Sequence, residues 1–100
     1  MKTSIQSAAL ADLRRGFHFY ERQEEGLGTY FLDSLYSDID SLRLYAGIHP
    51  IHFKKFSRLL SNRFPFAVSY EVKENTAFVR AVLDLRRDPA WIAGKLNKSK

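Results

Sequence analysis

Arginine side chains in the second half of the sequence are the residues best suited to chemistry. Guanidinium groups bind phosphates and carboxylates through paired hydrogen bonds, and they stabilise the charge that develops when an RNA 2′-hydroxyl attacks the adjacent phosphate. If the strands that carry these arginines pair in chain order, we expect the arginines to lie near one another. The set consists of Arg58, Arg63, Arg80, Arg86 and Arg87, with Lys54 and Lys55 beside it.

RNA cleavage also needs general acid and base groups, and the sequence offers few near these arginines. The nearest candidates are Tyr70, Glu71, Lys54 and Lys55, and no His or Tyr follows Tyr70. The arginines are also compatible with a solvated sheet face or with ion pairs to acidic side chains. The sequence alone does not choose between phosphate chemistry and charge pairing.

Sites for metals, nucleotides and nucleophilic catalysis are not indicated. The histidines His18, His49 and His52 lack metal-ligand spacing, and the chain has no cysteine. Gly26 and Gly28 lie between two helical stretches, whereas a phosphate-binding glycine loop follows a strand. No serine stands in a G-x-S-x-G turn. We therefore expect no metal ion and no cofactor.

Several aromatic residues favour protein partners. Phe19 and Tyr36 fall outside the apolar stripes of their helices, so their exposure would mark a protein-binding surface. Trp91 either packs the last helix onto the sheet or, if exposed, anchors an interface. A three-stranded sheet also has open edges, to which a partner can add a strand or a wrapping peptide.

Two stretches with helical spacing come first in the chain. In residues 7–25 the apolar face consists of Leu10, Leu13, Phe17 and Tyr20, and Asp12 belongs to the polar side. In residues 31–46 the apolar face consists of Phe31, Leu35, Ile39, Leu42 and Ala46. The short glycine-containing connection between them predicts an antiparallel helical hairpin.

The second half has the pattern of strands. Alternation predicts a hairpin of strands at 66–73 and 77–85, after a less regular strand at 53–61. In the last of these strands one face is expected to hold Ala77, Val79, Ala81, Leu83 and Leu85. Asp88 and Pro89 are the N-cap and first residue of a short terminal helix.

These elements predict an α+β fold in a single domain over residues 1–100. An N-terminal antiparallel helical hairpin packs on a small antiparallel sheet, a three-stranded meander with room for a short extra strand at 3–6. A short C-terminal helix completes the fold. We expect the ordered part to span about residues 5–96, with a polar tail at 97–100.

Charge and composition restrict the partners and the compartment. Residues 1–50 carry five basic and seven acidic side chains, whereas residues 51–100 carry eleven basic and four acidic ones. A basic half on a small domain indicates an anionic partner, either nucleic acid or an acidic protein segment. Because the chain has no cysteine and no apolar run long enough to span a membrane, we expect a cytoplasmic protein without membrane contact.

Five segments occur in an order that indicates a family. They are Ala11-Asp12-Leu13, Gly26-Leu27-Gly28 with Phe31, His49-Pro50, Arg63-Phe64-Pro65-Phe66 with Tyr70, and Arg86-Arg87-Asp88-Pro89-Ala90-Trp91. Together they resemble the RelE/ParE superfamily, the toxins of bacterial type II toxin–antitoxin modules, known from plasmid stabilisation and also found on chromosomes. The resemblance implies a toxin neutralised by a cognate antitoxin. In such modules the antitoxin wraps around the toxin, and the operator DNA is bound by the antitoxin and not by the toxin.

The resemblance implies one of two activities. RelE-like members are ribosome-dependent mRNA endonucleases, and ParE-like members inhibit DNA gyrase. Arg63 and Arg80 match phosphate-binding residues of the nucleases, but Asp84 stands where many members have His, and Trp91 offers no proton. The closing segment looks more like the ParE side, so we expect a gyrase inhibitor that acts by binding rather than by covalent chemistry.

Three sets of residues follow from this interpretation. The target-binding set is Arg86, Arg87 and Trp91, and the antitoxin-binding set is Phe19, Tyr36, Arg58, Arg63 and Arg80. A ribonuclease acting on mRNA at the ribosome would instead use Lys54, Lys55, Arg58, Arg63 and Arg80. A third alternative is a decayed toxin that only binds its antitoxin.

Overall fold

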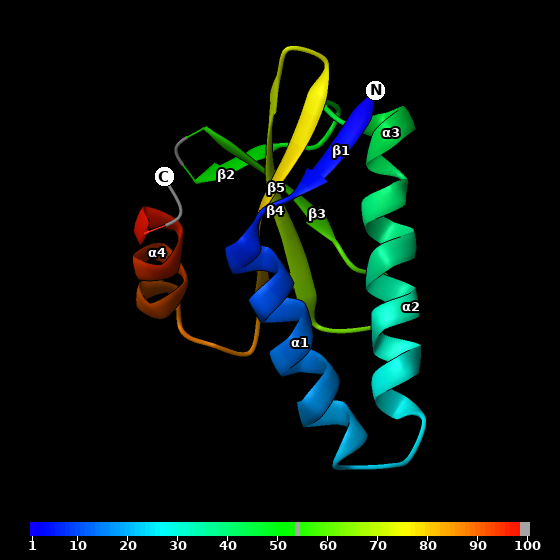
Figure 1. Cartoon of the computed structure of the whole chain (residues 1–100). Coiled ribbons are helices and arrows are strands. Elements are labelled where there is room, and N and C mark those ends of the chain that lie inside the picture. The colour runs from blue at the N-terminus through cyan, green and yellow to red at the C-terminus, as the bar shows by residue number, and fades with distance from the viewer. Residues whose placement is uncertain (54, 99–100) are drawn as a thin grey trace.

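The computed structural model describes residues 1–53 and 55–98. A helical hairpin covers one face of a sheet, and the C-terminal helix packs on the other face (Figure 1). In chain order the elements are β1 (Lys2–Ile5), α1 (Ser7–Glu21), α2 (Leu27–Asp40), α3 (Leu42–Tyr45), β2 (Ile51–Phe53), β3 (Phe56–Leu60), β4 (Phe66–Lys73), β5 (Thr76–Asp84) and α4 (Pro89–Lys98). The predicted α+β class is confirmed.

The sheet has the strand order β1-β5-β4-β3-β2, and its centre is the predicted meander of β3, β4 and β5. The extra N-terminal strand is present as β1, which pairs parallel to β5 with Ile5 opposite Val79. The strand predicted at 53–61 is confirmed as β3, which is shorter, at Phe56–Leu60. A further strand that the sequence did not predict, β2 at Ile51–Phe53, pairs antiparallel with β3 at the edge of the sheet.

A β-bulge in β5 overturns the predicted alternation of its side chains. Val79 lies opposite Tyr70 and Ala81 lies opposite Ser69, so Arg80 is an extra residue with no partner in the register. Before the bulge, Val79 packs against the helical hairpin, whereas after it Ala81 packs on the other face of the sheet, beneath α4. The extra residue therefore exchanges the two faces of the strand.

The predicted helical hairpin is confirmed, with α1 ending earlier than its sequence pattern. The carboxylate of Glu21, the last residue of α1, accepts hydrogen bonds from the backbone N–H groups of Gly26 (3.0 Å) and Gly28 (2.9 Å). Gly26 has a φ of 88°, in the left-handed region that glycine adopts at low cost. These contacts turn the chain from α1 into α2. The second predicted helix is also interrupted, since α2 ends at Asp40 and α3 begins at Leu42.

The main core lies between the hairpin and the sheet. Phe31 of α2 is fully buried, and its ring packs against the rings of Tyr20, Phe64 and Phe66. The apolar face predicted for the second helix is confirmed by the burial of Phe31, Leu35, Ile39 and Leu42. In α1, by contrast, Leu10 is 39% exposed and Asp12 only 4% exposed, so the buried face is rotated from the predicted one.

The predicted start of the C-terminal helix is confirmed. Asp88 caps α4, since its Oδ1 accepts a hydrogen bond from the N–H of Trp91 at 2.9 Å. Leu96, 2% exposed, packs with Phe56 and Ala81 in a second, smaller core. The helix extends to Lys98, two residues into the stretch assigned to a polar tail.

Candidate functional site

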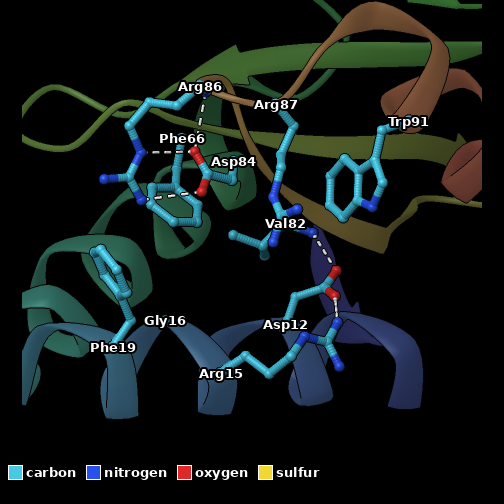
Figure 2. A pocket seen from close by; sticks show the side chains of 10 residues that line it. All are labelled: Asp12, Arg15, Gly16, Phe19, Phe66, Val82, Asp84, Arg86, Arg87 and Trp91. Atoms are coloured by element: carbon cyan, nitrogen blue, oxygen red, sulfur yellow. Dashed lines mark hydrogen bonds and ion pairs between the residues drawn. The ribbon is translucent and has the colours of Figure 1, made fainter.

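A cavity of about 160 Å³ opens where α1, the end of β5 and the start of α4 meet (Figure 2). Its lining includes Arg86, Arg87 and Trp91, the three residues predicted to bind the target, together with Phe19 from the predicted antitoxin surface. The structure therefore brings four of the predicted site residues together.

The cavity exists because β1 is too short to cover the whole edge of β5. Their pairing ends with Ile5 opposite Val79, and α1 begins two residues later. The backbone N–H of Val82, beyond this point, donates a hydrogen bond to Oδ2 of Asp12 at 2.9 Å. A carboxylate from a helix thus satisfies a strand-edge donor that a neighbouring strand would otherwise satisfy.

Asp12 also pairs with two positively charged side chains. Its Oδ1 accepts hydrogen bonds from Arg15 on the same helix and from Lys95 on α4. One carboxylate therefore joins α1, β5 and α4 around the cavity. The predicted position of Asp12 on the polar side of its helix is wrong, because partners 70 and 83 residues away leave no trace in the local pattern.

Arg86 forms one wall of the cavity and is fixed by Asp84. Its Nε and Nη2 donate to the two carboxylate oxygens of Asp84 at 2.9 Å each. Its guanidinium lies 4.8 Å from the ring centroid of Phe19. Burial alone would raise the pKa of Asp84, but the hydrogen bonds and charge of Arg86, together with the charge of Arg87, outweigh burial and lower that pKa. The charge of Arg86 is therefore already matched.

Arg87 has different surroundings from its neighbour Arg86. Its guanidinium lies 4.8 Å from the ring centroid of Trp91, which is 37% exposed. In Figure 2 the side chain of Arg87 lies between the Arg86–Asp84 pair and Trp91. Within residues 1–53 and 55–98, no carboxylate forms an ion pair with Arg87.

Arg80 lies in a separate cluster on the face of the sheet away from the hairpin. Its Nε and Nη2 donate to Oε1 of Glu71 at 2.9 and 2.5 Å, and Lys55 and Lys73 approach Glu71 at 3.5 and 3.9 Å. Glu71 is 5% exposed. Burial alone would raise its pKa, but the hydrogen bond from Arg80 and the three positive charges outweigh burial and lower that pKa.

The remaining predicted residues are dispersed. Arg63 lies over the ring of Tyr30 at 5.7 Å, and Tyr36, 43% exposed, lines a groove between α1 and α2. Arg58 lines a groove beneath α4 that it shares with Arg87. Lys54 lies outside the described residues. The expectation that the five arginines lie near one another is therefore met only in part: Arg58, Arg86 and Arg87 line adjoining grooves, whereas Arg63 and Arg80 have other surroundings.

Tyr70, a candidate proton donor, is unsuited to that role. It is fully buried in the main core, where its hydroxyl accepts a hydrogen bond from the N–H of Gly47 at 3.1 Å. The same hydroxyl lies 2.5 Å from Nδ1 of His49. The pair anchors the connector between α3 and β2, and the Tyr70 side chain itself has no exposed surface.

Among the residues that the structure describes, no cluster of histidine, aspartate and glutamate side chains has a metal-binding arrangement. No helix in this part of the chain is both long and apolar enough to cross a membrane.

Comparison with known proteins identifies the fold. No protein-family model and no curated protein matches the chain. A chain of a solved structure, described as "Chromosomal ParDE TA system from P. aeruginosa", matches with a TM-score of 0.76 and 18% sequence identity. The two chains share one fold. The match covers 85% of this chain and 96% of the other, and it confirms the predicted α+β fold.

Proposed function

We propose that this chain is the toxin of a type II toxin–antitoxin module and that a cognate antitoxin protein neutralises it. The observation that carries this proposal is the fold shared along 85% of the chain with a solved structure described as a ParDE toxin–antitoxin system. The five sequence segments that resemble the superfamily support the same assignment. The proposal implies a cytoplasmic protein, because the targets of such toxins lie there.

Regulated expression in bacteria tests this proposal. We expect induction of the chain to arrest growth and co-expression of the small reading frame next to its gene to restore it. Soluble expression at high level with undiminished growth would contradict a toxin. If the protein then still bound the neighbouring gene product, it would be a decayed toxin that only binds its antitoxin.

We propose DNA gyrase as the target and binding as the mode of action. Support comes from the cavity between α1 and α4, where Arg87 and Trp91 are exposed on one surface. Two candidates for acid–base catalysis among the described residues are poorly placed for it, since Tyr70 is buried and Glu71 is paired with Arg80. Supercoiling by purified gyrase should fall as antitoxin-free protein is added, and undiminished supercoiling at a large excess would exclude this target.

One observation favours the alternative, a ribosome-dependent mRNA endonuclease. Arg80, Lys55 and Lys73 surround a single carboxylate, so the face of the sheet around Glu71 carries surplus positive charge for a phosphate. Cleavage of mRNA on translating ribosomes, lost in Arg80→Ala, would establish this activity over gyrase inhibition.

A further inference from the structure

The charges that line the cavity of Figure 2 are matched with one exception. Three arginines and two aspartates contribute to its lining. Arg15 is bonded to Asp12, and Arg86 is bonded to Asp84 through both carboxylate oxygens. Arg87 is the arginine of this cavity that forms no ion pair within residues 1–53 and 55–98. Its guanidinium acts on Asp84 only through charge at longer range, so its N–H groups are available to hydrogen-bond a ligand.

The side chain of Arg87 is also oriented in advance. The Arg87 guanidinium lies 4.8 Å from the ring centroid of Trp91, and Arg87 is exposed, so a planar carboxylate can approach it and accept two parallel hydrogen bonds. A group fixed before binding loses less conformational entropy when it binds. The backbone N–H of Arg87 donates to the carbonyl oxygen of Asp84 at 3.1 Å, which fixes the start of the side chain as well.

Apolar surface lies on both sides of this guanidinium. Phe19, Phe66 and Val82 line the first cavity. Arg87 also lines a second groove of about 390 Å³, where Pro89, Ile92 and Leu96 supply apolar surface. When a carboxylate binds Arg87, an apolar side chain next to that carboxylate can therefore enter either of the two grooves.

The balance of charge favours a protein ligand over a nucleic acid. Nucleic-acid binding depends on several cations that neutralise successive phosphates. Here two aspartates share the lining with the arginines, and two of those arginines are already bonded to them. One free guanidinium between apolar surfaces fits one carboxylate beside an apolar side chain.

We propose that Arg87, stacked on Trp91, binds a carboxylate in an acidic segment of a protein partner, and that an apolar side chain next to that carboxylate enters the cavity. Arg86 does not bind the carboxylate in this arrangement; with Asp84 and Phe19 it forms the opposite wall. The inference rests on the proposed function, because it names the partner chemistry for the same site.

Peptide selection on the purified full-length chain tests the proposal. Displayed random peptides of about twelve residues are selected for binding, and the enriched peptides are synthesised. Trp91 is the one tryptophan of the sequence, so its fluorescence reports binding at this site. We expect the enriched peptides to carry Asp or Glu beside an apolar residue, and replacement of that acid by its amide to weaken binding about tenfold or more.

Variants of the chain separate this site from nonspecific attraction. Arg87→Gln should weaken binding about tenfold, and Arg87→Lys should weaken it less, because the charge remains but the paired geometry is lost. Arg43→Gln is the matched control, since Arg43 is an exposed arginine paired with Asp40 and lines neither of the two grooves that Arg87 lines. It should bind the peptides like the unmodified chain.

Three results would overturn the proposal. They are enriched peptides without acidic residues, peptide binding unchanged in Arg87→Gln, and Arg87-dependent binding of a ten-nucleotide single strand that is tighter than binding of the peptides. The assay requires no growth arrest and no gyrase. Failure of the proposed function with intact peptide binding, or the reverse, would therefore be distinguishable.

Discussion

At the scale of single residues, Asp12 holds together the elements that form the cavity. Its carboxylate accepts hydrogen bonds from the backbone of Val82 and from the side chains of Arg15 and Lys95, so it ties α1 to both β5 and α4. A buried carboxylate is stable only when its partners are in place. Arg87 and Trp91 depend on this arrangement, because α4 is held beside α1 by Lys95.

Asp12→Ala should destabilise the protein by about 3 kcal/mol. The substitution leaves the Val82 N–H without its side-chain acceptor and removes the ion pair between Asp12 and Lys95. Asp12→Asn retains an acceptor for Val82 and loses only the charge, so its effect should be smaller. Urea unfolding of the two variants measures the difference, and equal stability of Asp12→Ala and the unmodified chain would contradict this role.

Glu71 should make the free energy of unfolding depend on pH in the acidic range. Its pKa in the folded state lies below the ordinary value, so the ionised group stabilises the folded state at neutral pH. That contribution is lost as pH falls through the folded-state pKa. In Arg80→Gln the loss of the hydrogen bond raises the pKa of Glu71, so the variant should be less stable at neutral pH and converge with the unmodified chain in acid.

Urea unfolding at about pH 7 and about pH 3 tests this convergence. Arg43→Gln is the control, because the exposed pair of Arg43 and Asp40 contributes at most about 0.5 kcal/mol at either pH. A constant difference between Arg80→Gln and the unmodified chain across this range would show that Arg80 acts through packing rather than through the charge of Glu71.

At the scale of elements, the close approach of α1 and α2 depends on Gly16. A Cβ atom at this position would lie 2.4 Å from Cζ of Phe31, well inside van der Waals contact. Phe31 is fully buried among other aromatic rings and has no free space into which it can move. The two helices therefore pack closely because one contributes a glycine and the other a phenylalanine.

Gly16→Ala should destabilise the protein by about 1–3 kcal/mol through this overlap. Gly94→Ala in α4 is a matched control, because a Cβ there meets no atom within 4 Å. Both changes remove a glycine from a helix and gain about 1 kcal/mol of helix propensity, so their difference isolates the clash. Thermal unfolding measures it, and a stabilised Gly16→Ala would mean that Phe31 can move aside.

The sequence predicted elements better than it predicted their junctions. The helical hairpin, the β4–β5 hairpin and the Asp88 cap each follow from neighbouring residues, whose spacing is visible in the chain. The bulge at Arg80 has no such signal, because it is a property of two strands in register. The ion pairs of Asp12 with Lys95 and of Arg80 with Glu71 join residues that only the folded chain brings together.

At the scale of the whole molecule, the basic second half does not form one positive face. The sheet separates the cluster around Glu71 from the hairpin, and the cavity with Arg87 opens at the edge of β5, where α1 and α4 meet. Arg63 packs on Tyr30 of α2. A short acidic segment therefore cannot cover all five arginines, and inhibition by an antitoxin would require a longer wrapping chain or selective coverage of one site.

The two arginine sites allow the proposed activities to be distinguished in cells. If the protein acts by binding a target at the cavity, Arg87→Gln should abolish growth arrest, because the substitution removes the unmatched charge and the stacking on Trp91. Arg80→Gln should still arrest growth, provided that the protein remains folded at the temperature of the experiment. An endonuclease acting at the face around Glu71 would show the opposite dependence, since Arg80 and its neighbouring lysines would hold the phosphate.

Growth curves after induction, with protein levels matched by immunoblot, provide the measurement. Arg43→Gln should arrest growth as the unmodified chain does, because Arg43 lies on the exposed surface of α3 and lines neither site. Loss of arrest in Arg87→Gln alone would support binding at the cavity, and loss in Arg80→Gln alone would support the nuclease. Unfolding caused by either substitution would appear as reduced soluble protein rather than as a selective loss of activity.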